Sequence, residues 1–143
     1  MAPVLLPITL TAVGGAGIIN FWLAVRTGLI RRATGVEVGD GGNLPLIRRM
    51  RAHANFVEYT PFVLLLIALV EFNIGSPTWL WAVSAVFLLS RIAHALGMDG
   101  MPAGRAVGTA VTFAALLGLS AYAVALPFIG GARTGAETMI RVR

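Results

Sequence analysis

One stretch decides how this chain can fold: RRMRAHANFVEYTPFVLLLIALV, residues 48–70. Its first part carries three arginines, an amide, a carboxylate and a phenol, whereas its last nine residues are entirely apolar. Ionisable side chains at the depth of a membrane are costly, and by default they mark a functional site. The stretch therefore predicts a transmembrane helix that carries a polar site at one end.

The polar side chains of this stretch gather on one face if it is helical. At the angular spacing of an α-helix, five of them fall within an arc of about 100°. These five are Arg48, Arg51, Asn55, Glu58 and Tyr59. Such a face offers guanidinium groups, an amide, a carboxylate and a hydroxyl, which suits a small zwitterion with several carboxylates and an ammonium group. The alternative is an Arg–Glu network that only fastens helices together.

The composition is that of an integral membrane protein with a single domain over residues 1–143. The chain is 57% hydrophobic and 12% charged, whereas soluble domains have about 25% charged residues. Cysteine is absent, which excludes disulfides and cysteine nucleophiles. With two histidines, no structural zinc site is expected. All eleven basic residues are arginine; because they flank apolar segments, they indicate topology and anion binding rather than nucleic acid.

Four apolar segments are long enough to cross a hydrocarbon core of ~30 Å. We expect an all-α bundle of four transmembrane helices, at about residues 4–33, 45–72, 78–98 and 103–130, and a polar tail at residues 131–143. The uncharged run at the start is too long for a signal peptide, so it is interpreted as the first span. Glu71 is expected in water, at the end of the second span.

The arginines also predict the orientation in the membrane. Eight of the eleven lie on the side of the first and third connections, which the positive-inside rule assigns to the cytoplasm. We expect a multi-pass protein of a bacterial inner membrane, with its site facing the cytoplasm.

Arg105 lies in the first turn of the fourth segment. A cation there opposes the helix macrodipole, so its position makes sense if the arginine and the helix N-terminus face one anion. The alternative is an anchor whose side chain reaches the lipid headgroups. His94 shares a helical face with Arg91 and Met98; taken alone, it is expected to be a packed or interfacial histidine.

Residues 51–61, RAHANFVEYTP, resemble the second-helix signature of the MAPEG family, membrane-associated proteins in eicosanoid and glutathione metabolism. That signature is an Arg-Ala dipeptide, an Asn four residues after the Arg, then Glu, Tyr and a nearby Pro. The arginine-rich end of the first segment resembles the family as well. So does Arg91-Ile92-Ala93-His94 followed by Arg105, and the likeness covers about residues 5–130.

The resemblance implies four-helix protomers that form homotrimers and bind glutathione between neighbouring protomers at the cytoplasmic side. It implies a glutathione transferase that conjugates hydrophobic electrophiles, or a glutathione peroxidase, with glutathione as co-substrate and without a metal. By position, Arg105 matches the catalytic arginine that activates the thiol, and Arg31 is a better match than Arg26 for the arginine that ends the first helix. The positions that match glutathione contacts are Arg31, Arg26, Arg51, Asn55, Glu58, Tyr59 and His94.

Two positions depart from the family pattern. Met98 stands where a tyrosine is expected one turn after His94, and Ala106 stands where prostaglandin-forming members have a serine. These departures leave open a membrane binding or structural protein of the same fold that lacks catalysis. A small multidrug transporter is a third alternative, but such transporters need a carboxylate in the first span, and residues 4–25 contain none. Arg48 matches no family contact.

Overall fold

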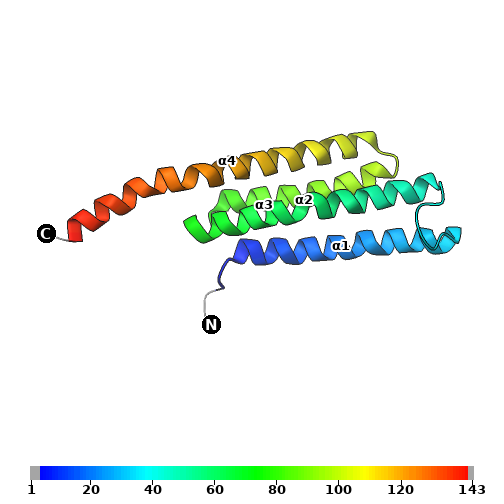
Figure 1. Cartoon of the computed structure of the whole chain (residues 1–143), viewed down its shortest axis with the longest axis horizontal. Coiled ribbons are helices and arrows are strands. Elements are labelled where there is room, and N and C mark those ends of the chain that lie inside the picture. Colours follow the sequence, from blue (N-terminus) through cyan, green and yellow to red (C-terminus); the bar gives the residue numbers. More distant parts are fainter. Residues whose placement is uncertain (1–3, 142–143) are drawn as a thin grey trace.

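In the described part of the chain, four antiparallel helices joined by short connections form a bundle (Figure 1). The computed structural model describes the backbone of residues 4–141 and the side chains up to Ile129. The helices are α1 (Pro7–Thr34), α2 (Leu44–Ile74), α3 (Thr78–Met98) and α4 (Pro102–Arg141). All four are long and apolar enough to cross a membrane, with Pro102–Ile129 as the candidate span of α4. This confirms the predicted all-α, four-span fold.

The segment expected as a polar tail, residues 131–143, lies entirely beyond the described side chains. The backbone of α4 continues without interruption to Arg141, and residues 142 and 143 lie outside the described part of the chain.

Helices α2 and α3 occupy the centre of the bundle. Helix α1 packs on both of them from one side and α4 packs on both from the other, so that the backbones of α1 and α4 are not neighbours within the described residues. Figure 1 shows α1 and α4 along opposite edges of the molecule. The polar half of α2 therefore lies beside α3 and α4, which carry the candidate residues His94 and Arg105.

Local sequence signals define the helix ends near this polar half. Helix α1 ends at Gly35, which adopts a left-handed conformation (φ 67°) and donates its N–H to the carbonyl of Arg31; glycine adopts this conformation without steric cost. Helix α2 begins after Asn43, whose side-chain oxygen accepts from the Leu46 N–H at 2.9 Å, and Pro45 lies in its first turn. Both are favoured residues at a helix start.

The prediction that Glu71 lies in water is wrong. Its side chain is only 1% exposed, because it reaches across to the N-terminus of α1. Its two carboxylate oxygens accept from the backbone N–H groups of Ile8 (2.9 Å) and Thr9 (2.7 Å), and from the hydroxyls of Thr9 (2.7 Å) and Ser76 (2.6 Å). The first N–H groups of a helix have no partner within the helix, so α2 supplies the cap that α1 lacks.

The core differs between the two ends of the bundle. At the Glu71 end, side chains from all four helices form one apolar cluster: Ile8, Val63, Ile67, Val70, Leu80, Phe87 and Leu119. Toward the other end, a second apolar cluster joins only α1, α2 and α3: Ala16, Ile19, Leu23, Ala52, Phe56 and Ala95. There the contact among α2, α3 and α4 runs through polar side chains instead, and this is where the candidate site lies.

Candidate functional site

The last turns of α3 and the first turns of α4 touch backbone to backbone. A Cβ atom on Gly97 would lie 2.1 Å from the Arg105 nitrogen, and one on Gly108 would lie 2.5 Å from the His94 Cβ. Only hydrogen fits at these two positions. The glycines thereby set the backbone of Arg105 beside the end of α3 and bring His94 against α4.

Contacts along α4 bring the candidate residues to one end of the bundle. The Arg105 backbone lies beside Gly97 of α3. About one turn further along α4, Gly108 lies beside His94 of α3. Further along α4, Thr112 and Phe113 contact Arg91 and Tyr59, respectively. From Arg105 to Phe113 the distance along the helix axis is about 12 Å. The site residues of α2, α3 and α4 therefore share roughly two turns of the bundle.

A buried arginine joins the three helices. Arg91 on α3 is 1% exposed. It donates from Nη1 to the Thr112 hydroxyl on α4 at 2.7 Å and from Nη2 to the Asn55 Oδ1 on α2 at 2.6 Å. Its Nε is buried without a partner, and no carboxylate of the described residues pairs with it. The sequence interpretation missed this role, although an arginine inside an apolar segment is itself a signal.

His94 is packed inside the bundle, with 5% of its surface exposed. Its Nδ1 is buried and has no hydrogen-bond partner among the described residues. The burial agrees with a packed histidine, which is the expectation from this residue alone. Its match to a glutathione contact stays a prediction.

The charged residues on the polar face of α2 are exposed. Arg51, Glu58 and Arg48 lie on the surface, as does Arg105 at the start of α4. None of the four forms an ion pair with the described residues. The predicted alternative, an Arg–Glu network within the chain, is therefore not formed by Arg51 or Glu58.

Tyr59 is half-buried between α2 and α4. Its ring packs edge-on against Phe113, with the two ring centroids 5.6 Å apart. This contact fixes the position of the phenol at the inner end of the site.

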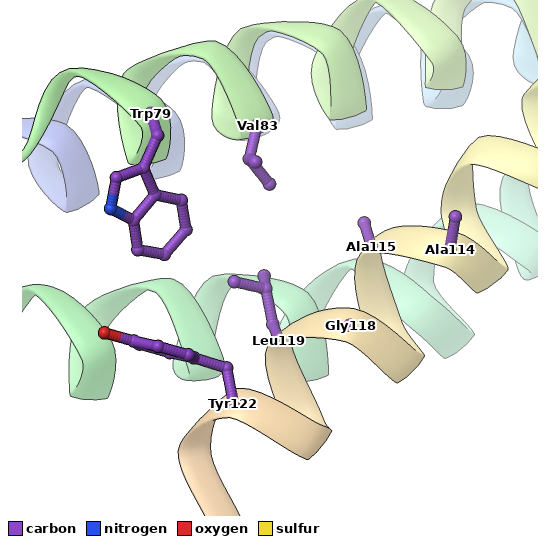
Figure 2. Close-up of a pocket in the computed structure, with 7 residues that line it drawn as sticks. All are labelled: Trp79, Val83, Ala114, Ala115, Gly118, Leu119 and Tyr122. Carbon is purple, nitrogen blue, oxygen red and sulfur yellow. The ribbon is translucent and has the colours of Figure 1, made fainter. Parts of the chain in front are cut away.

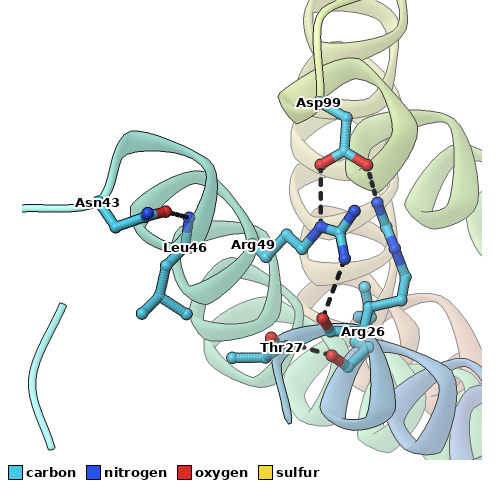
Figure 3. A network of polar contacts seen from close by, with 7 residues as sticks. Arg26, Thr27, Asn43, Leu46, Arg49 and Asp99 are labelled. Carbon is cyan, nitrogen blue, oxygen red and sulfur yellow. Dashed lines mark hydrogen bonds and ion pairs between the residues drawn. The ribbon is translucent and has the colours of Figure 1, made fainter. Parts of the chain in front are cut away.

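Arg26 forms an ion pair with Asp99, a loop residue that was not among the predicted site residues. Its guanidinium group pairs with Asp99 at the end of α3 and stacks over Trp22, 4.4 Å from the ring centroid. Arg49 lies on the other side of the same carboxylate, with Nε 3.7 Å from Oδ1, and donates to the Arg26 carbonyl at 3.1 Å. Figure 3 shows each oxygen of Asp99 joined to one of the two guanidinium groups. Asp99 thus ties α1 and α2 to the α3–α4 connection.

Arg31 closes the connection between α1 and α2. Its Nη1 donates to the carbonyl of Gly39 at 2.7 Å, and its Nη2 lies 3.3 Å from the Met50 sulfur. Both Arg26 and Arg31 therefore have partners within the protomer, and their match to glutathione contacts stays a prediction.

An apolar cleft opens between α3 and α4, away from Arg105. Its volume is about 380 Å³, and its lining runs from Ala114 to Tyr122 on α4 and includes Trp79 and Val83 on α3. Figure 2 shows the Trp79 and Tyr122 rings at one end of this cleft; their centroids are 5.5 Å apart. Ala114 is nine residues beyond Arg105, which is about 14 Å along the helix.

The chain is similar in sequence to known membrane proteins. The model of the MAPEG family matches residues 9–125. Inner membrane protein YecN of Escherichia coli strain K12 is 36% identical over 84 residues, which are 57% of this chain and 63% of that protein. YecN of Escherichia coli O6:H1 strain CFT073 matches to the same extent. The matched part is thus less than two thirds of the length of these relatives, and their name states a location but no activity.

The family match includes every candidate site residue on α1, α2, α3 and α4, from Arg26 to Arg105. It agrees with the resemblance carried by residues 51–61 and with the four-helix architecture. The chain belongs to the MAPEG family.

Proposed function

We propose that this protein is a membrane-bound glutathione transferase that stabilises the thiolate of glutathione and conjugates it to hydrophobic electrophiles, with glutathione peroxidase activity at the same site. One observation carries the proposal. Three charged side chains without ion-pair partners in the described chain, those of Arg51, Glu58 and Arg105, lie at the same end of the bundle as Asn55 and Tyr59.

The residue types fit the charges of glutathione, which has two carboxylates, one ammonium group and one thiol. The Arg51 guanidinium can pair with a carboxylate, and the Glu58 carboxylate can pair with the ammonium group, in charge-assisted hydrogen bonds. These two residues and Asn55 hold the tripeptide, whereas Arg105 acts on its sulfur.

Arg105 supports the chemical step. A neighbouring guanidinium group lowers the pKa of a thiol below its ordinary value of about 8.5, and the positive end of the α4 dipole lies at the same place. The thiol releases its proton to water, and the thiolate sulfur then forms a bond to the electrophilic carbon of the second substrate. The bond from that carbon to the leaving group breaks, and the leaving group departs with the electron pair, as chloride does from 1-chloro-2,4-dinitrobenzene. The fixed positive groups require no reorganisation as the thiolate forms, which is how preorganised electrostatics accelerate a reaction.

The assembly in this proposal is a homotrimer in an inner membrane, with the site on the cytoplasmic side. Arg51 and Glu58 are exposed on the side of a membrane-spanning helix, and charged groups in that position face protein or water rather than lipid. A neighbouring protomer that covers this face would enclose the glutathione. The location follows the name of the Escherichia coli relatives.

A second candidate is a binding or structural protein of the same fold without catalysis. Met98, which replaces the expected tyrosine, is half-buried and packs against the apolar cluster of α1, α2 and α3. Ala106 offers no hydroxyl next to Arg105. In this case the protein would not ionise the thiol of glutathione.

Rapid mixing of the purified protein with glutathione, followed by ultraviolet absorbance of the thiolate, separates the two candidates. We expect Arg105→Ala to keep glutathione affinity but to lower both the thiolate signal and the conjugation of 1-chloro-2,4-dinitrobenzene by about 100-fold or more. Arg32→Ala, at another exposed arginine of the same end, is the matched control. Unchanged turnover in Arg105→Ala would exclude the thiolate role, and a wild-type protein that gives no thiolate signal would favour the second candidate.

A further inference from the structure

Arg91 is a buried cation whose described partners are neutral. In the membrane-spanning part of α3, its guanidinium group donates to a threonine hydroxyl and to an amide oxygen. A buried charge is normally paired with an opposite charge, yet no carboxylate of the described residues lies within ion-pair distance. Both of its partners stand on the helices that carry the site, so its position calls for an explanation within the site.

The contact with Arg91 fixes which way the Asn55 amide faces. A guanidinium group has hydrogen-bond donors only. The group that lies 2.6 Å from the Arg91 Nη2 must therefore be the amide oxygen of Asn55. The Asn55 Nδ2 then points away from Arg91, and it has no acceptor among the described residues. Asn55 is half-buried on the same face as Arg51 and Glu58, so its amide N–H groups are the part that a ligand can meet.

The same contact changes the character of that donor. An isolated asparagine can donate or accept, and so it can serve a carboxylate or an ammonium group equally well. With its oxygen turned toward Arg91 and accepting from that cation, Asn55 presents its NH₂ group, a donor, to a ligand on this face. Because hydrogen bonds in a chain polarise one another, the guanidinium charge also strengthens the N–H donor at the far end of the amide.

We propose that Arg91 is a positioning residue that makes Asn55 a dedicated donor to a carboxylate of glutathione, and that the ammonium group is left to Glu58. This inference rests on the proposed function, because it names the part of glutathione that Asn55 recognises. It gives Arg91 a role in selectivity without contact to the ligand.

The first test measures binding of four probes by calorimetry to the full-length protein in detergent. The probes are glutathione, its glycine monoethyl ester, its γ-glutamyl α-carboxamide and its N-acetyl derivative, so that each analogue neutralises one charged group. We expect Asn55→Ala to weaken glutathione binding about 10- to 100-fold, the range for a hydrogen bond to a charged group. For one of the two carboxylate-blocked analogues this factor should fall to about 2-fold or less, and for the N-acetyl analogue it should persist.

Asn55→Asp keeps an oxygen for Arg91 but removes the donor. We expect this variant to elute and unfold like the wild type and yet to bind glutathione about 100-fold more weakly, because an oxygen would then face the carboxylate. Asn73→Asp, at the opposite end of α2, is the matched control and should bind like the wild type. Binding of glutathione to Asn55→Asp with wild-type affinity would overturn the inference.

A double-mutant cycle separates positioning from a merely structural role. Arg91→Met should weaken binding about 10-fold in the wild type, but by only about 2-fold in the Asn55→Ala background. Equal effects in both backgrounds would show that Arg91 does not act through Asn55. A penalty of Asn55→Ala that vanishes for the N-acetyl analogue would also overturn the inference, since Asn55 would then accept from the ammonium group.

The two proposals fail in different ways. If the wild-type protein binds none of the four probes, the proposed function fails and the inference falls with it. If the wild type binds glutathione but the Asn55 penalty is equal for all four probes, only the inference fails.

Discussion

Single residues of this chain act across helices. Glu71 is the clearest case, because its carboxylate belongs to α2 but satisfies the first N–H groups of α1. An anionic group at a helix N-terminus is also favoured by the helix dipole. The residue therefore fixes the end of the bundle that lies farthest from the candidate site.

We expect Glu71→Gln to lower the free energy of unfolding by about 2–4 kcal/mol. All four groups around the carboxylate donate hydrogen bonds, so the amide NH₂ of glutamine would face donors and leave part of them unsatisfied. Reversible unfolding in mixed micelles measures the change, with Glu37→Gln in the exposed α1–α2 connection as the control. Equal stability of the two variants would contradict the capping role. Glutathione affinity should not change, because Glu71 lies at the other end of α2.

The sequence could predict which residues share a face, but it could not predict their partners. The spacing of Arg51, Asn55 and Glu58 follows from the period of one helix, so their common face was predictable. Arg91 and Asp99 were not recognised, because their contacts with Asn55 and Arg26 join residues 36 and 73 positions apart in the sequence. Such pairs depend on how the helices cross, which no single segment encodes.

At the scale of the elements, the pairing of α3 and α4 positions the site. Two helices can approach this closely only where side chains are missing from the contact. Gly97 lies against the Gly104–Arg105 backbone, and Gly108 lies against Ser90 and His94. The existence of the four helices was predictable from the length of their apolar segments. The register between α3 and α4 was not, because it depends on which glycines meet.

Gly97→Ala should separate α3 from α4 and displace Arg105. A Cβ at this position would lie 2.1 Å from a backbone atom that cannot move alone, so we expect a loss of about 3 kcal/mol in unfolding free energy, at the upper end for overpacked cores. Because Arg105 would be displaced, Gly97→Ala should also lower the amount of glutathione thiolate that forms. Gly14→Ala is the control, since a Cβ there meets nothing within 4 Å and alanine favours a helix. The close contact of α3 and α4 would be contradicted if Gly97→Ala were as stable as Gly14→Ala in micelles.

At the scale of the whole molecule, polar groups divide between two ends with different tasks. The Glu71 end holds a closed set of hydrogen bonds around one carboxylate. The opposite end holds the ion pairs of Asp99, the buried Arg91 and the exposed Arg51, Glu58 and Arg105. This second end leaves the charged groups of Arg51, Glu58 and Arg105 available to a ligand, so the orientation of the bundle decides which compartment supplies that ligand.

The arginine distribution predicts that this second end faces the cytoplasm. Eight arginines flank the α1–α2 and α3–α4 connections, and the other three follow the fourth span; such a bias sets the orientation of most multi-pass proteins. The natural chain has no cysteine, so single cysteines report on one position each. Val38→Cys lies in the α1–α2 connection, where Val38 is 90% exposed, and Thr78→Cys lies at the start of α3.

A membrane-impermeant maleimide applied to right-side-out vesicles should modify Thr78→Cys and spare Val38→Cys, and inside-out vesicles should give the reverse. Both variants should react fully in detergent, which controls for the intrinsic reactivity of each cysteine. The opposite labelling pattern would place the site outside the cell. Glutathione would then have to reach Arg51 and Arg105 from outside the cytoplasm, against the orientation that the arginines predict. The gathering of eight arginines at this end would then reflect ligand binding rather than membrane topology.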